Sequence, residues 1–452
     1  MKTNLFMALA FAFLMLFAAC TEEKIIYVEK ENGIEVLPGE GVIKISLSND
    51  LLTRTARPIG SSEAANNVNR IKFSFINTSS GTEVSDGVEI AGAYNSSGTE
   101  MESGFSVATD DKSILILPDN NAVKNFYVKF KSLPGEGSYT IIVYGYNCES
   151  GNNSFPYTKS IGAETSPKYF ECSNIEPSVV EEIFAGYCIR KNASSGEENR
   201  FISINQYNMF SEEVSVTITR QVAGLMAYLE KVPTSIDNKS VDKITISTPV
   251  KMNGFIIPAS IVTSITGRKE GYNGNYDKSS YKSNVDLLTF TIKDKENVDS
   301  SGDYYEFNKE GSDGKKYLLA DGMSEDDFTT LECKDNTLFG SCFLLPYSGH
   351  MDFKGTQGYE DKTTLNLTYY TAKEDGSYET IKIVKLKNSN STEDYPELDY
   401  DIRCNHFYSV GGKTDVDTTT DDDPLDISDE TGYMDVFLTI NDTWDGTLDL
   451  IK

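Results

Sequence analysis

Apolar and polar residues alternate with a period of two in many short segments of this chain, and no other feature constrains its fold as strongly. In residues 41–51, four aliphatic side chains fall on one face of an extended chain: Ile43, Ile45, Leu47 and Leu51. Further strands are predicted at 68–76, 113–117, 125–130, 138–146, the first part of 214–229, 243–246, 287–292, 343–346, 364–370, 379–386 and 434–440. The sequence contains no strong amphipathic helix and no internal repeat. The pattern therefore predicts an all-β protein.

The N-terminus has the charge and length pattern of an export signal. Lys2 precedes an apolar run over 5–17, which is too short for a comfortable transmembrane helix. The run ends at Ala18-Ala19-Cys20, which resembles a lipobox, so we expect a lipoprotein signal peptide over 1–19 and lipidation of Cys20. The alternative is an ordinary secretory signal that is cut near Ala19. No later segment is apolar for long enough to cross a bilayer, so the acyl chains would be the membrane attachment.

The composition suits strands that are joined by turns. The chain has 26 Tyr and 34 Gly but a single Trp, and aromatic and β-branched residues favour strands. The mature length of about 430 residues exceeds the size at which single cores stop growing. A polar break over 191–199 divides the strand-rich regions. We therefore expect a tether over 20–40, an N-terminal β-sandwich over 41–190 and a C-terminal β-sandwich over 200–452.

The net charge limits the kinds of partner. The chain has 41 basic and 69 acidic residues, and its formal net charge is −28. Such a charge argues against binding to nucleic acid or to an anionic lipid surface.

The cysteines do not form a metal-binding pattern. Six follow Cys20, none in a Cys-x-x-Cys pair: Cys148, Cys172, Cys188, Cys333, Cys342 and Cys404. With only His350 and His406 as further ligands, a zinc site is not expected. The spacing of Cys333 and Cys342 allows a strand-turn-strand to close a local disulfide, because an exported chain meets an oxidising compartment. Buried free thiols are the alternative.

No residue pattern indicates catalysis. The carboxylates of 415–423 lack the Gly and the terminal Glu of an EF-hand loop, so a solvated loop is the preferred interpretation over a Ca²⁺ site. Neither histidine stands beside a recognisable nucleophile, and Gly-x-Ser-x-Gly is absent. We expect neither an enzyme nor a cofactor.

Several segments resemble one protein family. Residues 217–225, 343–346, 403–410 and a closing β-run that ends at Trp444 resemble the fimbrillins, the subunits of Bacteroidetes type V pili. The acidic pair Glu22-Glu23 resembles the signal that sends Bacteroidetes lipoproteins to the outer face of the outer membrane, although it can also simply begin a solvated tether. The family fold that the resemblance implies is two tandem transthyretin-like antiparallel β-sandwich domains.

The resemblance also implies an assembly mechanism. In fimbrillins an arginine-specific protease cuts the loop after the first strand, this strand leaves with the lipid, and the C-terminal segment of another subunit fills the groove. Here the first strand would be 42–51, and Arg54 and Arg57 follow it. Arg54 is the better scissile residue, because Pro58 obstructs cleavage after Arg57. The alternative is that both arginines are solvated loop residues.

The resemblance leaves two functional classes. The first is a structural subunit of a surface fimbria that assembles with other fimbrillin-like subunits, with Leu448, Leu450 and Ile451 as donor-strand candidates. The short tail after Trp444 favours an accessory, tip or anchor subunit over a stalk subunit. The second class is a monomeric surface lipoprotein that binds a glycan or another host or bacterial surface ligand. A single Trp near the C-terminus favours the first class, because sugar binding usually needs aromatic platforms.

Overall fold

The structure is a computed structural model of the chain. It describes residues 29–31, 33–47, 68–101, 104–118, 125–162, 167–176, 180–191, 198–266, 273–275, 281–293, 297–307, 314, 316–325, 335–348, 365–388, 401–405, 407–410 and 437–441. Nearly all regular structure in these residues is β, and the helical turns η2 (Ala259–Ile261) and α3 (Val262–Thr266) are short exceptions. The all-β prediction is confirmed.

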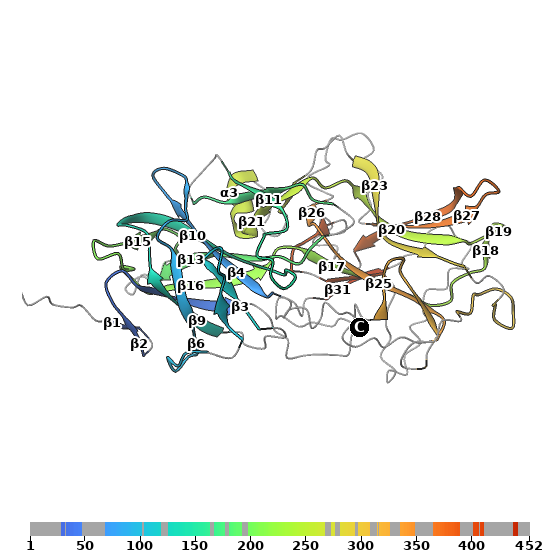
Figure 1. Cartoon of the computed structure of the whole chain (residues 1–452). Helices are drawn as coiled ribbons and strands as arrows, with labels where there is room; N and C mark the ends of the chain where they lie inside the picture. Colours follow the sequence, from blue (N-terminus) through green and yellow to red (C-terminus); the bar gives the residue numbers. More distant parts are fainter. Residues whose placement is uncertain are drawn as a thin grey trace, which may run out of the picture.

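A twelve-stranded sheet occupies one half of the elongated molecule (Figure 1). Its main path runs through β6 (Glu89–Tyr94), β9 (Asn125–Ser132), β3 (Gly41–Leu47), β16 (Val214–Arg220), β13 (Phe184–Lys191), β10 (Gly137–Tyr146), β4 (Arg70–Asn77), β8 (Ile114–Ile116) and β7 (Ser106–Val107). The short strands β5 (Glu83–Val84), β14 (Glu198–Asn199) and β15 (Ile202–Ile204) pair alongside this path.

This sheet curls over its own core. The ring of Phe130 on β9 lies 5.1 Å from Phe73 and 5.8 Å from Phe75, both on β4, although β9 and β4 stand far apart in the strand order. Edge-to-face contacts of buried aromatic rings at this distance are favourable. The two flanks of the sheet therefore face each other as in a sandwich.

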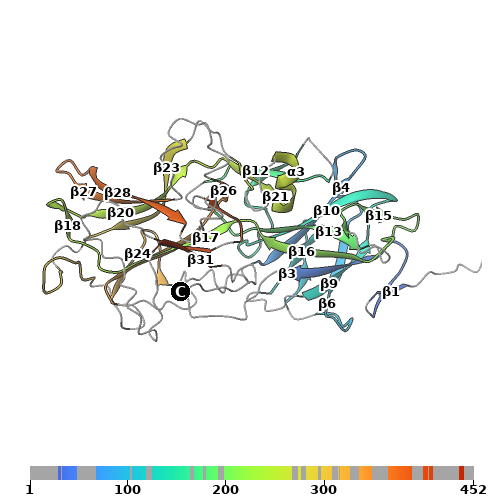
Figure 2. The ribbon, with the colours of Figure 1, turned by 180° about the vertical axis from the view of Figure 1, so that it is seen from behind.

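A nine-stranded sheet builds the other half, and the view from behind shows the same division (Figure 2). Its order is β23 (Tyr281–Thr291), β20 (Lys243–Val250), β27 (Leu365–Ala372), β28 (Tyr378–Asn388), β31 (Phe437–Asn441), β30 (Phe407–Val410), β17 (Ala223–Leu229), β25 (Thr337–Leu344) and β24 (Tyr317–Leu319). Small two-stranded pairs are β1 (Glu29–Glu31) with β2 (Ile34–Val36), β18 (Ser235–Ile236) with β19 (Lys239–Ser240), and β26 (Tyr347–Ser348) with β29 (Asp401–Ile402).

A four-stranded sheet joins the two halves. It is formed by β11 (Thr158–Ile161), β12 (Phe170–Ser173), β21 (Gly254–Ile257) and β22 (Gly274–Asn275), and β12 pairs with β21 from the later part of the chain. The rings of Tyr157 and Phe255 meet here with centroids 5.4 Å apart. One continuous apolar core therefore crosses the junction.

The run 214–229 divides into two strands. Gln221 is fully buried between β16 and β17. Its side-chain amide donates to the carbonyl oxygen of Thr219 at 2.7 Å and accepts from the backbone N–H of Ala259 at 2.6 Å. These bonds satisfy the amide away from water and let the chain pass from the first sheet into the second.

The first sheet does not end at the predicted end of the N-terminal domain. Strands β14 to β16, which follow residue 190, pair with strands that precede it, so the first sheet extends to Arg220. The ranges 41–190 and 200–452 and the transthyretin-like assignment stay predictions.

Most strand pairs in the described residues are antiparallel, as expected, but four are parallel: β3–β16, β17–β30, β24–β25 and β28–β31. Parallel neighbours require long connections between the strands, and the alternation within one segment does not reveal them.

Candidate strand-exchange site

Strand β3 lies inside the first sheet. It pairs antiparallel with β9 from Gly41 to Ser46 and parallel with β16 from Ile43 to Leu47. We call the space between β9 and β16 that β3 fills the β3 slot. Without β3, two neighbouring strands would present unpaired backbone N–H and C=O groups, which is the template that an added strand recognises.

The inner face of β3 contributes to the core. Ile43 and Ile45 are fully buried, in a cluster with Phe126, Phe130 and Val216. Burying an aliphatic side chain of this size is worth roughly 1.5 to 3 kcal/mol. Leu47 is half-buried at the end of the strand and packs against the same cluster. Any strand in the β3 slot therefore needs apolar side chains at alternating positions.

Gly41 lies at the end of the β3 slot where neighbouring side chains leave no space for a side chain. A Cβ atom at this position would lie 2.7 Å from Leu133 Cδ1 and 2.7 Å from Phe210 Cε2. Both neighbours are buried side chains, which leaves them little room to move. The slot therefore admits no side chain at the position of Gly41.

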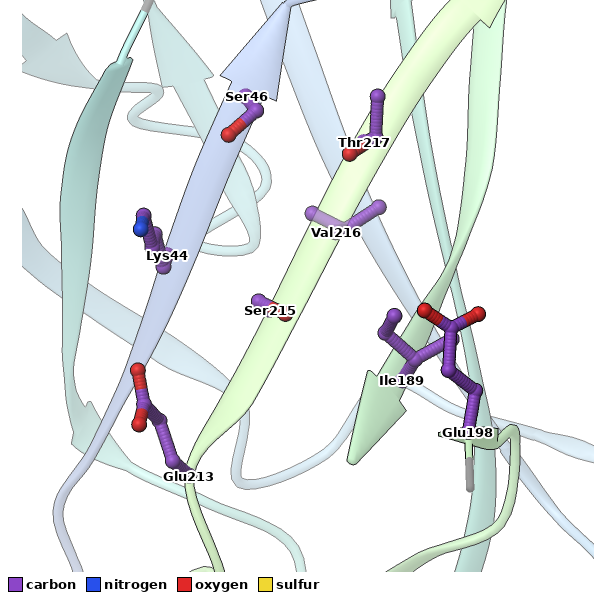
Figure 3. A pocket seen from close by; sticks show the side chains of 8 residues that line it. All are labelled: Lys44, Ser46, Ile189, Glu198, Glu213, Ser215, Val216 and Thr217. Atoms are coloured by element: carbon purple, nitrogen blue, oxygen red, sulfur yellow. The ribbon is translucent and has the colours of Figure 1, made fainter. Parts of the chain in front are cut away.

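The outer face of β3 is polar along most of its length. A hollow of about 330 Å³ lies over β3, β16 and β13 (Figure 3). It is lined by Lys44, Ser46, Ile189, Glu198, Glu213, Ser215, Val216 and Thr217. No group of three or more His, Cys, Asp or Glu side chains that could hold a metal occurs within the described residues. The polar lining of this hollow is what we expect of a sheet face that is in contact with water.

The β1–β2 hairpin covers the beginning of the outer face. Ile34 and Val36 pack with Val42, Tyr127 and Met209 in a small apolar cluster. This hairpin lies within 20–40, for which the sequence pattern predicted only a tether. The dipeptide Asn32-Gly33 between alternating residues is the signal that could have revealed it, because such a pair favours a tight hairpin turn.

Polar contacts fix the turn between β2 and β3. The ammonium group of Lys129 on β9 lies 2.8 Å from Glu40, and the two side chains are only 15% and 17% exposed. Gly39 donates its backbone N–H to the carbonyl oxygen of Tyr207 at 2.8 Å and accepts from Leu133 at 3.0 Å. The hairpin, the turn and β3 thus form one unit that β9 and the turn at 205–210 hold.

Most predicted site residues lie outside the described residues: Cys20, Arg54, Arg57, Cys333, Leu448, Leu450 and Ile451. The same holds for the carboxylates of 415–423, for both histidines and for Trp444. The connection that carries Arg54 and Arg57 runs between the described strands β3 and β4.

Cys342 is the one described member of the predicted disulfide. It lies on β25, and it forms no disulfide with another cysteine of the described segments. Desolvation raises the pKa of its thiol to about 12, which keeps the thiol protonated and poorly reactive. The bridge to Cys333 stays a prediction.

The predicted strand at 434–440 is confirmed in its described part. β31 lies between β28 and β30, and it pairs antiparallel with β30 and parallel with β28. Because β31 is internal, it is paired with β30 from Leu438 to Asn441 and with β28 at Phe437 and Leu438. A donor strand from this end of the chain therefore has to come from the residues after Asn441, as the three candidates do.

Among the described residues, no helix combines the length and the apolar character that are needed to span a bilayer.

Comparisons with known proteins give similarity at the level of structure. No protein-family model and no curated protein matches the chain. A solved structure to which it is similar is the fimbrial anchor protein Mfa2 of Porphyromonas gingivalis, with 10% identity, 82% of this chain and 90% of that chain covered, and a TM-score of 0.25.

Two further similar structures are a proposed adhesin of Bacteroides thetaiotaomicron and a proposed cell adhesion protein of Parabacteroides distasonis. The first has 12% identity and a TM-score of 0.30, with 76% of this chain and 80% of that chain covered. The second has 12% identity and a TM-score of 0.30, with 82% and 87% covered. At these values the similarity establishes no shared function. In these comparisons the chain is similar to fimbrial and cell adhesion proteins.

Proposed function

We propose that this protein is a structural subunit of a cell-surface fimbria of the type V pilus kind, exported as a lipoprotein through Cys20 and assembled by strand exchange at the β3 slot. Before processing, the lipid holds it on the outer face of the outer membrane, and afterwards it joins the fimbrium. The observation that carries the proposal is the place of β3. It is an internal strand, yet only the β1–β2 hairpin precedes it among the described strands.

The energetics of β3 favour exchange over simple loss. Removing it uncovers the hydrophobic floor under Ile43 and Ile45 and leaves β9 and β16 as open edges. Open edges next to an apolar groove attract another strand, and main-chain hydrogen bonds together with alternating side chains supply affinity and register. An emptied β3 slot therefore favours the binding of a replacement strand.

The arginine-containing connection is the point at which β3 can be released. A cut after Arg54 separates the β1–β3 unit from β4, so that only non-covalent contacts keep β3 in the sheet. Exposed connections between strands are also the preferred sites of proteolytic nicking. Arg57 is the poorer site because Pro58 follows it.

Limited digestion of the purified mature chain tests this function. An arginine-specific protease is expected to cut between residues 52 and 68, preferentially after Arg54, and the cut chain is expected to form polymers. Arg54→Ala should abolish most cutting and assembly, whereas the matched Arg57→Ala should change neither. Polymers that form equally well without cleavage, or a connection that resists the protease while other loops are cut, would contradict the proposal.

A monomeric glycan-binding lipoprotein is the second candidate, and a pair of tyrosines on β27 and β28 is the surface at which it can be tested. Tyr378 is 38% exposed, and its ring centroid lies 6.5 Å from that of Tyr370. The ammonium group of Lys243 lies 4.3 and 4.7 Å from the centroids of Tyr370 and Tyr378, so it occupies space that a sugar would need for stacking. Tyr378→Ala should leave assembly unchanged, and a loss of cell binding to glycans in this variant would support the second candidate.

A further inference from the structure

Two neighbouring turns at one end of the molecule each expose an apolar side chain. Leu37, in the turn between β2 and β3, is 38% exposed, and Tyr207, in the turn after β15, is 46% exposed. The backbone N–H of Gly39 donates to the carbonyl oxygen of Tyr207 at 2.8 Å, which joins the two turns. We call these two turns, residues 37–40 and 205–208, the apolar tip.

Hydrogen bonds fix the shape of both turns. In the first turn, Glu40 donates its backbone N–H to the carbonyl oxygen of Leu37 at 2.9 Å. In the second turn, the backbone carbonyl of Asn205 accepts from the N–H of Asn208 at 2.9 Å, and its side-chain oxygen accepts from that of Tyr207 at 2.9 Å. A partner therefore meets both apolar side chains on an ordered backbone and does not have to order a loop.

The predicted lipid anchor joins the fold beside the apolar tip. β1 begins at Glu29, which pairs with Val36, the residue before Leu37. Opposite residues of an antiparallel pair lie about 5 Å apart between their Cα atoms. Nine residues, 20–28, precede Glu29 from Cys20 onwards, and a chain of this length spans at most about 30 Å. A lipidated Cys20 therefore keeps the apolar tip close to the bilayer surface.

The β1–β2 hairpin and β15 lie at the end of the elongated molecule that is farther from the second sheet (Figure 1, Figure 2). We propose that the apolar tip docks on the surface of the lipid bilayer, so that the anchored, uncut protein holds its second sheet away from the membrane. This rests on the lipidation of Cys20 in the proposed function, and it adds the docking surface and the orientation. Tyrosine suits this place, because its ring is apolar while its hydroxyl group stays hydrated.

The bilayer fits the apolar tip better than a second copy of the chain in a polymer. Leu37 belongs to the β1–β3 unit, whereas Tyr207 follows β15 in the sheet that remains after a cut at Arg54. The two side chains are therefore together only while the lipid is attached. A short tether also holds the tip near the bilayer at an effective concentration on the order of millimolar, so a small apolar surface suffices.

The docking is apolar and not electrostatic. The chain has a net charge of −28, and at this end of the first sheet the carboxylates of Glu40 and Glu212 are already paired with Lys129 and Arg190, each at 2.8 Å. These charges give no attraction to anionic headgroups. High salt should therefore leave the docking intact, because salt screens interactions between charges.

Quenching of a tryptophan by brominated phosphatidylcholine tests the docking in the full mature chain, lipidated, uncut and reconstituted in phosphatidylcholine vesicles. The single native Trp444 is first replaced by Phe, so that Tyr207→Trp adds the only tryptophan. The lipid should quench this probe at least twofold more than the probe Tyr378→Trp on β28, and high salt should not change the difference. Leu37→Ser should reduce quenching of the first probe at least twofold, whereas the matched change Gln206→Ser, also at an exposed position, should not.

The outcomes separate the docking from the proposed function. Vesicle-bound protein in which the two probes are quenched equally overturns the docking, while lipidation stands. If the probe at position 207 is shielded from a water-soluble quencher only at high protein density, and not quenched by the lipid, a second copy covers the tip and the bilayer is the wrong partner. A chain that carries no acyl group and does not bind the vesicles overturns the lipidation of Cys20, and this inference falls with it.

Discussion

Arg220 stands where the first sheet ends and the chain enters the second. It is 1% exposed, and its guanidinium donates from Nε to Glu182 Oε1 at 2.5 Å, while the group also lies 4.9 Å from the ring of Phe184. Two charges in such a place are costly to remove from water, and each is tolerated only because the other is present. The junction between the sheets therefore contains a buried ion pair.

Replacing Arg220 by Ala should lower the free energy of unfolding by about 3 to 5 kcal/mol, because the buried Glu182 would lose its ion-pair partner and would have to take up a proton or stay charged without compensation. The matched variant Arg190→Ala removes the pair with Glu212, whose side chains are 27% and 42% exposed, and should cost less than about 1 kcal/mol. Urea unfolding of both variants gives the comparison. Similar losses in the two variants would contradict the importance of the junction pair.

Glu182 should make stability depend on pH near neutrality. Burial raises the pKa of its carboxyl to about 7, although Arg220 opposes the shift. Between the ordinary pKa and pH 7 the folded protein binds a proton that the unfolded chain has released. Stability from this group is therefore fully present at low pH and falls as the pH rises towards 7, by roughly 3 kcal/mol in all.

Thermal unfolding of the wild type and of Glu182→Gln between pH 4.5 and 8 measures this contribution. The wild type should lose more stability than the variant as the pH rises, because the Gln side chain does not titrate. General charge repulsion in this acidic chain acts on both proteins alike and cancels in the difference. Parallel pH curves would show that Glu182 keeps an ordinary pKa.

At the scale of elements, β3 is held in two ways. Its backbone is paired on both sides, and the β1–β2 hairpin adds the apolar contacts of Ile34 and Val36 over its outer face. Before cleavage these contacts all stabilise one sheet. After cleavage the same contacts determine how long the β1–β3 unit stays bound to the sheet, so the hairpin slows strand exchange.

Weakening the hairpin should speed the release of β3 from the cut protein. The double change Ile34→Ala and Val36→Ala removes buried aliphatic groups, each worth roughly 1 to 4 kcal/mol, and should accelerate loss of the fragment at least tenfold. Glu35→Ala on the exposed side of the same strand is the control and should have little effect. Gel filtration of the cut protein over time measures the release. Unchanged release in the double variant would mean that the strand ladder alone controls it.

At the scale of the whole molecule, the slot and the proposed donor belong to different sheets. β3 lies in the first sheet, and the donor segment follows β31 in the second. A contact between two different surfaces is heterologous, and such contacts build open chains when no rotation closes them into a ring. A fimbria requires this kind of assembly.

Deleting residues 445–452 should abolish polymer and leave the melting temperature of the monomer nearly unchanged. The described core ends with β31, so the deletion removes none of its strand pairs. Deleting from residue 437 onwards also removes β31 from the middle of the second sheet and should lower the melting temperature strongly. A large loss from the shorter deletion would place the tail in its own subunit instead of a neighbour's slot.

Replacing Cys20 by Ser should stop acylation and release or mislocalise the protein, because only a cysteine thiol can take the diacylglyceryl thioether. Metabolic labelling with a fatty acid, followed by separation of the outer membrane, measures both effects. Cys148→Ser is a suitable control, since Cys148 lies within the folded region. Labelling that persists in Cys20→Ser would contradict the lipoprotein prediction.

Local patterns in the sequence predicted the class of the fold and most strand positions. Alternation at Ile43, Ile45 and Leu47 requires an extended chain with one apolar face, whatever that face meets. The same local rule predicted the strand at 434–440. These features depend only on neighbours along the chain, and so they can be read without knowledge of tertiary partners.

The pairing of the strands, in contrast, could not be predicted from local patterns. The parallel contact of β3 with β16, the break at Gln221 that sends β17 into another sheet, and the exclusion of a side chain at Gly41 all involve residues far apart in sequence. Period-two alternation states which face is apolar but not which partner covers it. The choice among partners depends on long-range packing and on burying every polar group with a bond, and no single segment of the chain contains that information.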